Sequence, residues 1–329
     1  MPGWSAWLLL HFGLAAALTW GARRYALCRR LLDEPGERRS HTVATPRGGG
    51  IAIVACLLVA AAVAWTRPDA ISPFLVAFAV GLVLVAGIGW WDDHRPLSPA
   101  LRFVVQNIAA LVLAWGIYQI DSNPWLAGLT FALTLVLVNV WNFMDGINGL
   151  AASQAAIAAL AYAMVGSGVG TLLATALLAA CLGFLPFNYP RARIFLGDVG
   201  SGALGYALAA LWAISSGGRE ISMLIFLLPL TILLVDAGFT LATRMLAGER
   251  WWTPHITHVY QLAAKRYGHT AITCAYGALS LITLMMMLIS SRSSMYTAVL
   301  TLAAGYAAAG GIWLGVRRRM EPNKRADDA

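Results

Sequence analysis

Charged residues are scarce in this sequence, and their scarcity excludes most soluble proteins. Only 12% of the 329 residues are charged, whereas 59% are hydrophobic, and the mean hydropathy is +0.70. An average soluble domain has about 25% charged residues. The composition therefore indicates an integral membrane protein and argues against a soluble domain with a large core.

Cysteines are equally scarce, and their placement excludes a disulfide framework and a cysteine-based zinc site. The four cysteines form no C-x-x-C pair, and we interpret them as small core residues. The N-terminus also lacks a basic region before its first apolar stretch, which four arginines follow. We therefore expect that stretch to be a retained membrane span and not a cleaved signal peptide.

Hydropathy predicts an all-α, polytopic membrane protein with about eleven transmembrane helices. No large soluble segment, low-complexity stretch or internal repeat stands out, so we expect residues 1–329 to form a single transmembrane domain with a basic cytoplasmic tail at 317–329. The predicted spans cover approximately residues 4–22, 49–66, 73–91, 101–118, 125–142, 149–165, 169–187, 200–215, 221–242, 271–290 and 295–316.

The distribution of lysine and arginine predicts the orientation in the membrane. Twenty of the 23 such residues lie in alternate loops, and only Arg67, Arg219 and Arg292 lie in the others. Because positively charged loops stay in the cytoplasm, we expect the N-terminus outside and the C-terminus inside. The net charge of +8 is thereby attributed to topology and contact with membrane lipids, and not to nucleic-acid binding. Every loop rich in polar function then faces the cytoplasm.

The most informative stretch begins at Asn139, between two apolar segments, and has a polar residue at every third position as far as residue 148. Side chains three residues apart stay on one side of a helix. A carboxylate at the bilayer centre costs about 2.5–3.5 kcal/mol. We therefore predict a functional polar face at the end of a membrane helix. The alternative is a solvated helix end, with Gly146 and Gly149 as the stop signal. The residues of the predicted face are Asn139, Asn142, Asp145 and Asn148.

Three further aspartates lie in predicted cytoplasmic loops. Asp92 and Asp93 adjoin at the end of a predicted span, where two carboxylates repel each other unless a cation relieves them. Mg²⁺ suits this position because it binds carboxylates together with substrate phosphates. The alternative is the start of an ordinary surface loop. Asp198 is either another magnesium carboxylate or a cap of the following helix.

Basic side chains share these loops and indicate an anionic ligand. His255-x-x-His258 could bind zinc, but no cysteine or carboxylate adjoins it, so we expect hydrogen bonds to a phosphate or a sugar. For the first predicted cytoplasmic loop, which contains His41 and Arg47, the alternative is a flexible turn whose arginines only set the topology. Carboxylates for a divalent ion beside bases for an anion are the equipment of phosphoryl transfer. The basic candidates are His41, Arg47, Arg191, Arg193, His255 and His258.

Five segments, in this order along the chain, resemble the polyprenyl-phosphate N-acetylhexosamine-1-phosphate transferases. This family includes the peptidoglycan phospho-N-acetylmuramoyl-pentapeptide transferase and the enzymes that begin O-antigen and teichoic acid synthesis. The resemblance extends over approximately residues 33–270. The segments are Thr45-Pro-Arg-Gly-Gly-Gly50, Trp91-Asp92-Asp93, Asn139-x-x-Asn142-Phe-Met-Asp145-Gly-Ile-Asn148-Gly149, Phe195-Leu-Gly-Asp198-Val-Gly-Ser201 and His255-x-x-His258.

The resemblance implies an enzyme of the bacterial inner membrane whose active site faces the cytoplasm. Such an enzyme transfers an N-acetylated sugar-1-phosphate from a UDP-N-acetylhexosamine-type donor to undecaprenyl phosphate and releases UMP, with Mg²⁺ or Mn²⁺. Asp92 matches a proposed base for the acceptor phosphate, and Asp198 matches a metal ligand. Asp93 and Asp145 match further essential acidic positions, while Asn142 matches an active-site asparagine. The other candidates for substrate binding are Asn139, Asn148 and the basic residues named above.

Departures from the family pattern favour the O-antigen-initiating members. Pro96 stands where the peptidoglycan enzyme has a lysine, and Asn148 replaces an aspartate often found in the central motif. His255 and His258 are separated, whereas the histidines of the peptidoglycan enzyme are consecutive. The peptidoglycan-type reaction is the alternative within the family. Outside it, the alternative is a secondary transporter or flippase that uses intramembrane acidic residues. A homodimer is considered as the assembly.

Overall fold

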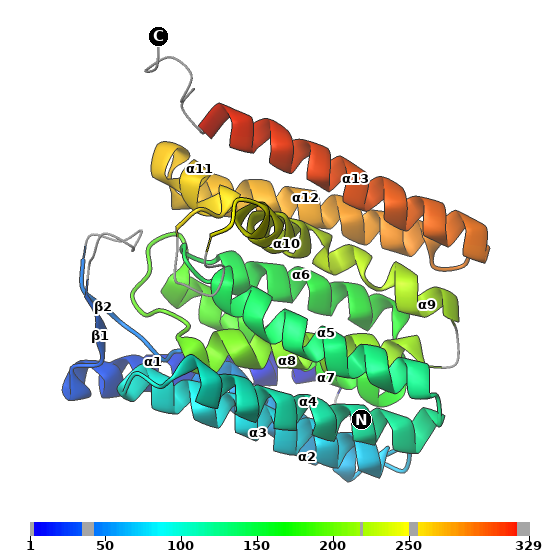
Figure 1. Ribbon diagram of the computed structural model, residues 1–329. Coiled ribbons are helices and arrows are strands. Elements are labelled where there is room, and N and C mark those ends of the chain that lie inside the picture. The colour runs from blue at the N-terminus through cyan, green and yellow to red at the C-terminus, as the bar shows by residue number, and fades with distance from the viewer. Residues whose placement is uncertain (1–2, 35–42, 218–219, 250–255, 321–329) are drawn as a thin grey trace.

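The computed structural model describes residues 3–34, 43–217, 220–249 and 256–320, and these are almost entirely helical (Figure 1). The predicted all-α class is thereby confirmed. The elements are α1 (Trp4–Arg29), β1 (Leu32–Asp33), β2 (Thr45–Pro46), α2 (Ile51–Trp65), α3 (Ser72–His94), α4 (Pro99–Asp121), α5 (Pro124–Phe143), α6 (Leu150–Val165), α7 (Gly168–Asn188), α8 (Asp198–Ser216), α9 (Glu220–Ile225), the 3-10 helix η1 (Leu228–Leu230), α10 (Thr231–Leu246), α11 (Val259–Tyr267), α12 (His269–Ser290) and α13 (Met295–Met320).

Among the described residues, nine helical segments are long and apolar enough to cross a membrane. Two further apolar helices, α2 and α6, have 15 and 16 residues. At 1.5 Å per residue they reach about 24 Å, less than the hydrocarbon core of about 30 Å. Each predicted span coincides with a helical segment, and the ninth is composed of α9, η1 and α10. The polytopic membrane class is confirmed, whereas eleven crossings stay a prediction.

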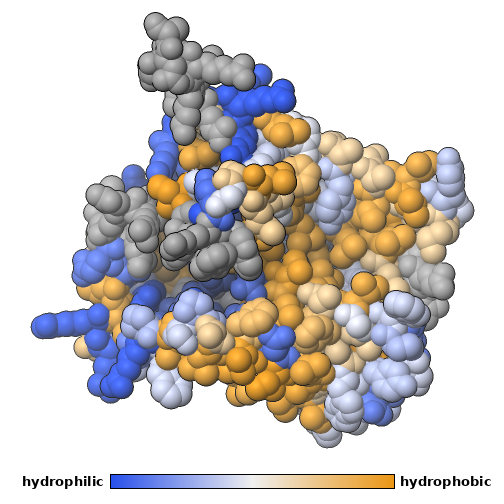
Figure 2. Space-filling model, viewed as in Figure 1, coloured by the Kyte–Doolittle hydropathy of each residue, from blue (hydrophilic) through white to orange (hydrophobic). Residues whose placement is uncertain are grey.

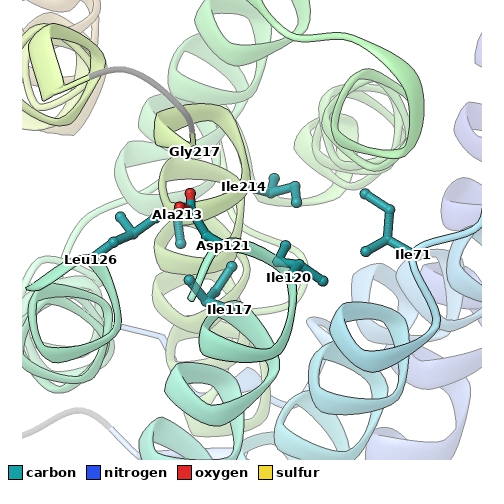
Figure 3. A pocket seen from close by; sticks show the side chains of 8 residues that line it. All are labelled: Ile71, Ile117, Ile120, Asp121, Leu126, Ala213, Ile214 and Gly217. Carbon is teal, nitrogen blue, oxygen red and sulfur yellow. The ribbon is translucent and has the colours of Figure 1, made fainter. Parts of the chain in front are cut away.

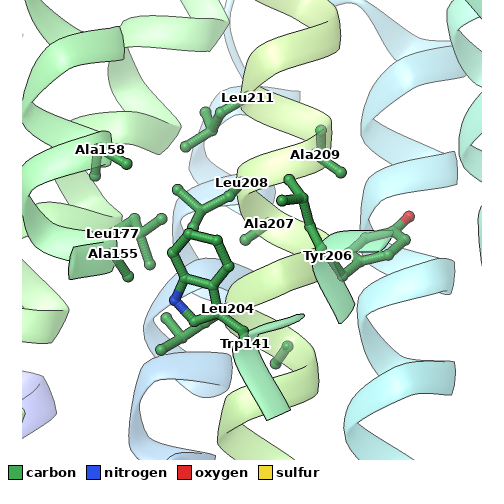
Figure 4. Packing of buried hydrophobic residues seen from close by; sticks show 14 of the residues in the cluster. Trp141, Ala155, Ala158, Leu177, Leu204, Tyr206, Ala207, Leu208, Ala209 and Leu211 are labelled. Carbon is green, nitrogen blue, oxygen red and sulfur yellow. The ribbon is translucent and has the colours of Figure 1, made fainter. Parts of the chain in front are cut away.

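The central member of the bundle is α8, whose side chains are nearly all buried. It packs against α3, α5 and α6, and Figure 4 shows its apolar core around Trp141. A Cβ at Gly205 would lie 2.3 Å from the carbonyl oxygen of Leu137 on α5. A Cβ at Gly89 on α3 would lie 2.4 Å from that of Asp198. These glycines therefore let α8 approach both neighbours, which brings its N-terminus beside the ends of α3 and α5.

The polar loops gather at the end of the bundle that carries β1 and β2 (Figure 1), and strongly hydrophilic surface lies toward this end (Figure 2). Backbone hydrogen bonds join loops that are distant in sequence: Phe195 N donates to Pro46 O at 2.7 Å. The side chain of Arg23 on α1 likewise donates to Arg193 O at 3.2 Å. The predicted cytoplasmic loops thus share one end, while the orientation of that end in the cell stays a prediction.

Reporter fusions test the orientation. Fusions in the loops predicted to be external should report an external location, because those loops hold only three basic residues. A periplasmic signal from the loop that contains His255 would overturn the orientation. The external positions are Pro68, Ser122, Gly168 and Ser293, and the internal positions are Arg39, His94, Tyr189 and Gly248.

Candidate active site

Asp93 connects the end of α3 to the beginning of α8. Its buried carboxylate accepts hydrogen bonds from the backbone N–H groups of Asp198 and Val199, both at 3.1 Å. The first N–H groups of a helix have no partner within the helix, and they favour a negative charge. Asp93 therefore caps α8 from another helix. The alternative that Asp198 only caps its own helix is wrong, because Asp198 uses its side chain elsewhere.

Asp92 and Asp198 share one cation, Arg102. Arg102 Nη1 on α4 donates to Asp92 Oδ2 at 2.8 Å and to Asp198 Oδ2 at 3.3 Å. The other oxygen of Asp92 accepts from Leu97 N at 2.6 Å. From the sequence, Arg102 was counted only as a topology signal. It is the second residue of the predicted span 101–118, and a charge inside a span is costly in the membrane, so its position was a sign of function.

Asn142 joins the carboxylates from the last turn of α5. Its Nδ2 donates to Asp198 Oδ1 at 2.7 Å and to Ser201 Oγ at 3.1 Å. Asn139, one turn earlier, instead donates to Gln106 Oε1 at 3.2 Å and to its own helix. Asn142 therefore orients Asp198, whereas Asn139 ties α5 to α4.

The predicted helical face does not continue to Asp145 and Asn148, because α5 ends at Phe143. Gly149 has a φ of 77°, a backbone conformation that suits glycine, and it is the N-cap of the next helix, α6. Asn148 Nδ2 donates to Pro190 O at 3.0 Å, and an aspartate there could not donate this hydrogen bond. The expectation of four polar residues on one helical face is thus wrong for Asp145 and Asn148. Asn148 holds the loop between α7 and α8 in this structure.

Asp145 lies in the turn after α5, close to other carboxylates. Burial, together with the negative charges of Asp198, Asp93 and Asp33, raises the pKa of Asp145 well above its usual range. Within the described part of the chain, no side chain donates a hydrogen bond to this carboxylate. Asp33 on β1 is a further acidic neighbour, which no sequence pattern indicated. A carboxylate placed in this way favours the binding of a cation.

The donor chemistry of this cluster fits Mg²⁺, which takes carboxylate oxygens and usually keeps several waters. Among the described residues, however, no group of three or more His, Cys, Asp or Glu side chains converges closely enough to hold a metal ion. Asp145, to which no described side chain donates, and Asp198, whose negative charge acts on it, are the carboxylates that would take part. The zinc alternative at His255-x-x-His258 cannot be compared with the structure, because His255 lies outside the described residues.

The basic candidates occupy different surroundings. Arg47 Nη2 donates to the backbone oxygen of Asp93, and Arg47 Nε lies 3.9 Å from Asp93 Oδ1. Arg191 and Arg193 are exposed on the loop between α7 and α8, at the same end of the bundle. His41, like His255, falls outside the described residues. Contacts of these side chains with a substrate stay predictions.

His258 is buried and lies against Asp236 on α10, and not in the aspartate cluster, which consists of Asp92, Asp93, Asp145 and Asp198. Its Nδ1 is 4.0 Å from Asp236 Oδ1, and its ring stacks on those of Phe143 and Tyr260. Burial lowers the pKa of His258, although the nearby Asp236 acts in the opposite direction. In this arrangement His258 is part of the packing behind the site and is not exposed at the surface.

A pocket of about 390 Å³ lies at the opposite end of the bundle (Figure 3). Isoleucine side chains dominate its lining, and none of the predicted site residues takes part. The pocket and the aspartate cluster are therefore separate features. Its lining consists of Ile71, Ile117, Ile120, Asp121, Leu126, Ala213, Ile214 and Gly217.

Comparisons with known proteins identify a family and several relatives. The model of glycosyl transferase family 4 matches residues 75–216, a range that contains Asp92, Asp93, Asp145 and Asp198. A decaprenyl-phosphate N-acetylglucosaminephosphotransferase of Mycobacterium tuberculosis is 33% identical, over 69% of this chain and 67% of the relative. A probable undecaprenyl-phosphate N-acetylglucosaminyl 1-phosphate transferase of Bacillus subtilis is 28% identical over 72% and 71%. A phospho-N-acetylmuramoyl-pentapeptide-transferase of Thermosynechococcus vestitus is 35% identical over 62% of each chain.

Proposed function

The chain belongs to the polyprenyl-phosphate N-acetylhexosamine-1-phosphate transferases of glycosyl transferase family 4, and on this premise we propose its donor, acceptor and pathway. The donor is a UDP-N-acetylhexosamine, the acceptor is undecaprenyl phosphate, and UMP is released. The lipid-linked product begins a surface polysaccharide of the O-antigen type. Because members of this family are phospho-sugar transferases, the transporter or flippase alternative is set aside.

The observation that carries the proposal is the meeting of Asp92, Asp145 and Asp198 with Arg102 and Asn142 at one end of the bundle. Phosphoryl transfer needs little covalent help from a protein and depends on positioning and charge neutralisation. Side chains held by one another across α3, α4, α5 and α8 supply such positioning.

In the proposed reaction, a phosphate oxygen of the acceptor attacks the sugar-bearing phosphorus of the donor. A new P–O bond forms there as the bond to UMP breaks, and the electron pair leaves with UMP. Asp92, held by Arg102 and the amide of Leu97, would take any proton that remains on the attacking phosphate. Arg102 is also placed to offset the charge of the phosphates. Mg²⁺ bound by Asp198 and Asp145 would neutralise the pyrophosphate.

The location follows the same proposal. UDP-sugars are cytoplasmic, so the end of the bundle with the aspartate cluster would face the cytoplasm from the bacterial inner membrane. The distribution of basic residues supports this orientation.

A panel of donors tests the reaction. Purified enzyme with undecaprenyl phosphate and Mg²⁺ should release UMP from an N-acetylhexosamine donor, because Pro96, Asn148 and the separated histidines depart from the peptidoglycan pattern. The donors are tested separately and UMP is measured. Release only from the pentapeptide donor would identify a peptidoglycan-type enzyme, and release from none would contradict the proposed reaction. The panel is UDP-GlcNAc, UDP-N-acetylfucosamine, UDP-N-acetylquinovosamine and UDP-MurNAc-pentapeptide.

A further inference from the structure

Asp236 on α10 is a buried carboxylate outside the matched family region and outside the aspartate cluster. Asp236 is 1% exposed, and its carboxylate accepts five hydrogen bonds from four helices, one of which is its own helix α10. A buried charge is costly unless it is well paired, so this degree of pairing needs an explanation. The donors are Val259 N, Tyr260 N, Trp313 Nε1, Tyr276 Oη and Thr240 Oγ1, at 2.7–3.2 Å.

Two of these donors are the first backbone N–H groups of α11. Val259 N donates to Oδ1 and Tyr260 N to Oδ2, both at 3.0 Å. These groups have no partner inside the helix, and a carboxylate at a helix N-terminus is stabilising. With nine residues, α11 is too short to be stable without tertiary contacts. Asp236 therefore supplies the contact that docks α11 on the bundle.

The docked helix in turn contacts the turn that carries Asp145. Tyr260 Oη donates to Phe143 O at 2.8 Å. A Cβ at Gly146 would lie only 2.2 Å from the same hydroxyl, so Tyr260 rests directly on this turn. His258, the residue before α11, stacks on Phe143. One chain of contacts thus leads from Asp236 through α11 to the residues on either side of Asp145.

We propose that Asp236 is a positioning residue for the transfer reaction, acting through α11 and Tyr260 to hold the Asp145 turn in place. It touches none of the four clustered aspartates itself. The structural part of this proposal is independent of the reaction, whereas its kinetic part rests on the proposed function.

Hydrogen–deuterium exchange of the purified, substrate-free protein tests the structural part. Asp236→Asn keeps the size of the side chain but replaces one acceptor by a donor that faces a backbone N–H. Exchange should accelerate about tenfold or more in residues 143–149 and 259–267, while α8 stays as protected as in the wild type. Faster exchange in α11 with an unchanged 143–149 segment would overturn the proposal.

Two further variants keep this test decisive. Ser280→Ala is the matched control, because it removes a buried hydrogen bond from α12 to Gln154 Oε1 on α6 and removes none of the hydrogen bonds that Asp236 and Tyr260 make. Its 143–149 segment should exchange as in the wild type. Tyr260→Phe removes the last link and leaves the Asp236 contacts to α11 in place, so it should loosen 143–149 even if Asp236→Asn fails to fold. Normal protection in folded Tyr260→Phe would contradict the proposal.

A double-mutant cycle tests the kinetic part. Asp236→Asn and Tyr260→Phe break the same chain of contacts, so the double variant should lose no more kcat/KM than Asp236→Asn alone. Losses that multiply would show two independent effects and overturn the kinetic role. If the wild type releases UMP from no donor, the proposed function fails, and the exchange experiment still decides whether Asp236 holds the turn.

Discussion

Replacing Asp198 by asparagine should lower turnover by about 10²–10³-fold or more, while the protein still inserts and purifies. Asp198 accepts from Arg102 and Asn142, at the N-terminus of the central helix. Asparagine has the same size but no charge, so it cannot help to hold a cation against the phosphates. UMP release per folded protein measures the effect. Full activity of Asp198→Asn would remove this residue from the site.

Two comparison variants separate loss of chemistry from loss of structure. Asp121→Asn, in the lining of the pocket at the opposite end, should be nearly silent. Asp93→Asn should also lose orders of magnitude in turnover, but for another reason. Its new amide would direct a donor at the N–H groups of Asp198 and Val199, which costs about 1–3 kcal/mol for a buried unsatisfied group. Asp93→Asn should therefore lower the thermal unfolding temperature, and Asp198→Asn should not lower it to the same degree.

Removal of divalent cations should abolish activity, and Mg²⁺ or Mn²⁺ should restore it. The site gathers four carboxylates beside the cations Arg47 and Arg102, and the substrates add phosphate charge. They are Asp92, Asp93, Asp145 and Asp198. UMP release is measured after chelation and again after each ion is added. Undiminished activity in excess chelator would contradict a metal requirement.

The pH dependence of this activation has a defined sign. The pKa of Asp145 is raised by burial and by neighbouring carboxylates, so protons occupy it at a higher pH than an ordinary aspartate. A proton and a cation compete for the same carboxylate. The Mg²⁺ concentration needed for half-maximal activity should therefore rise as the pH falls through this raised pKa. The same dependence in Asp145→Asn would assign the competition to another group.

Much of the fold was predictable because a membrane span is a long signal. Averaged over about 18–20 residues, hydropathy tolerates local irregularities, and every predicted span coincides with a helical segment. The strands of the β1–β2 sheet have two residues each, too few to establish an alternating pattern. The shortness of α2 and α6 was visible in the sequence, since glycines and polar residues bound both apolar runs, and the predicted spans 49–66 and 149–165 extend only slightly beyond the two helices.

The site was predictable where the aspartates lie next to helix ends. Asp92, Asp93 and Asp198 do meet, as the sharing of one membrane face led us to expect. The helical extrapolation to Asp145 failed because α5 ends at Phe143, so Asp145 lies in the turn that contains Gly146 and Gly149. Asp236 was not predicted as a site residue because its partners lie up to 77 residues away and because it lies inside a predicted apolar span, 221–242. A lone carboxylate within such a span was the available signal.

The cap that Asp93 provides also has a consequence for biosynthesis. The amides it accepts from are 105 and 106 residues further along the chain. At about 5–20 residues per second, a ribosome completes that interval in about 5–20 seconds. During this time α3 has emerged with a carboxylate that has not yet met its partners. The N-terminal helices therefore cannot reach their final arrangement until α8 has been synthesised, and the aspartate cluster can assemble only after that.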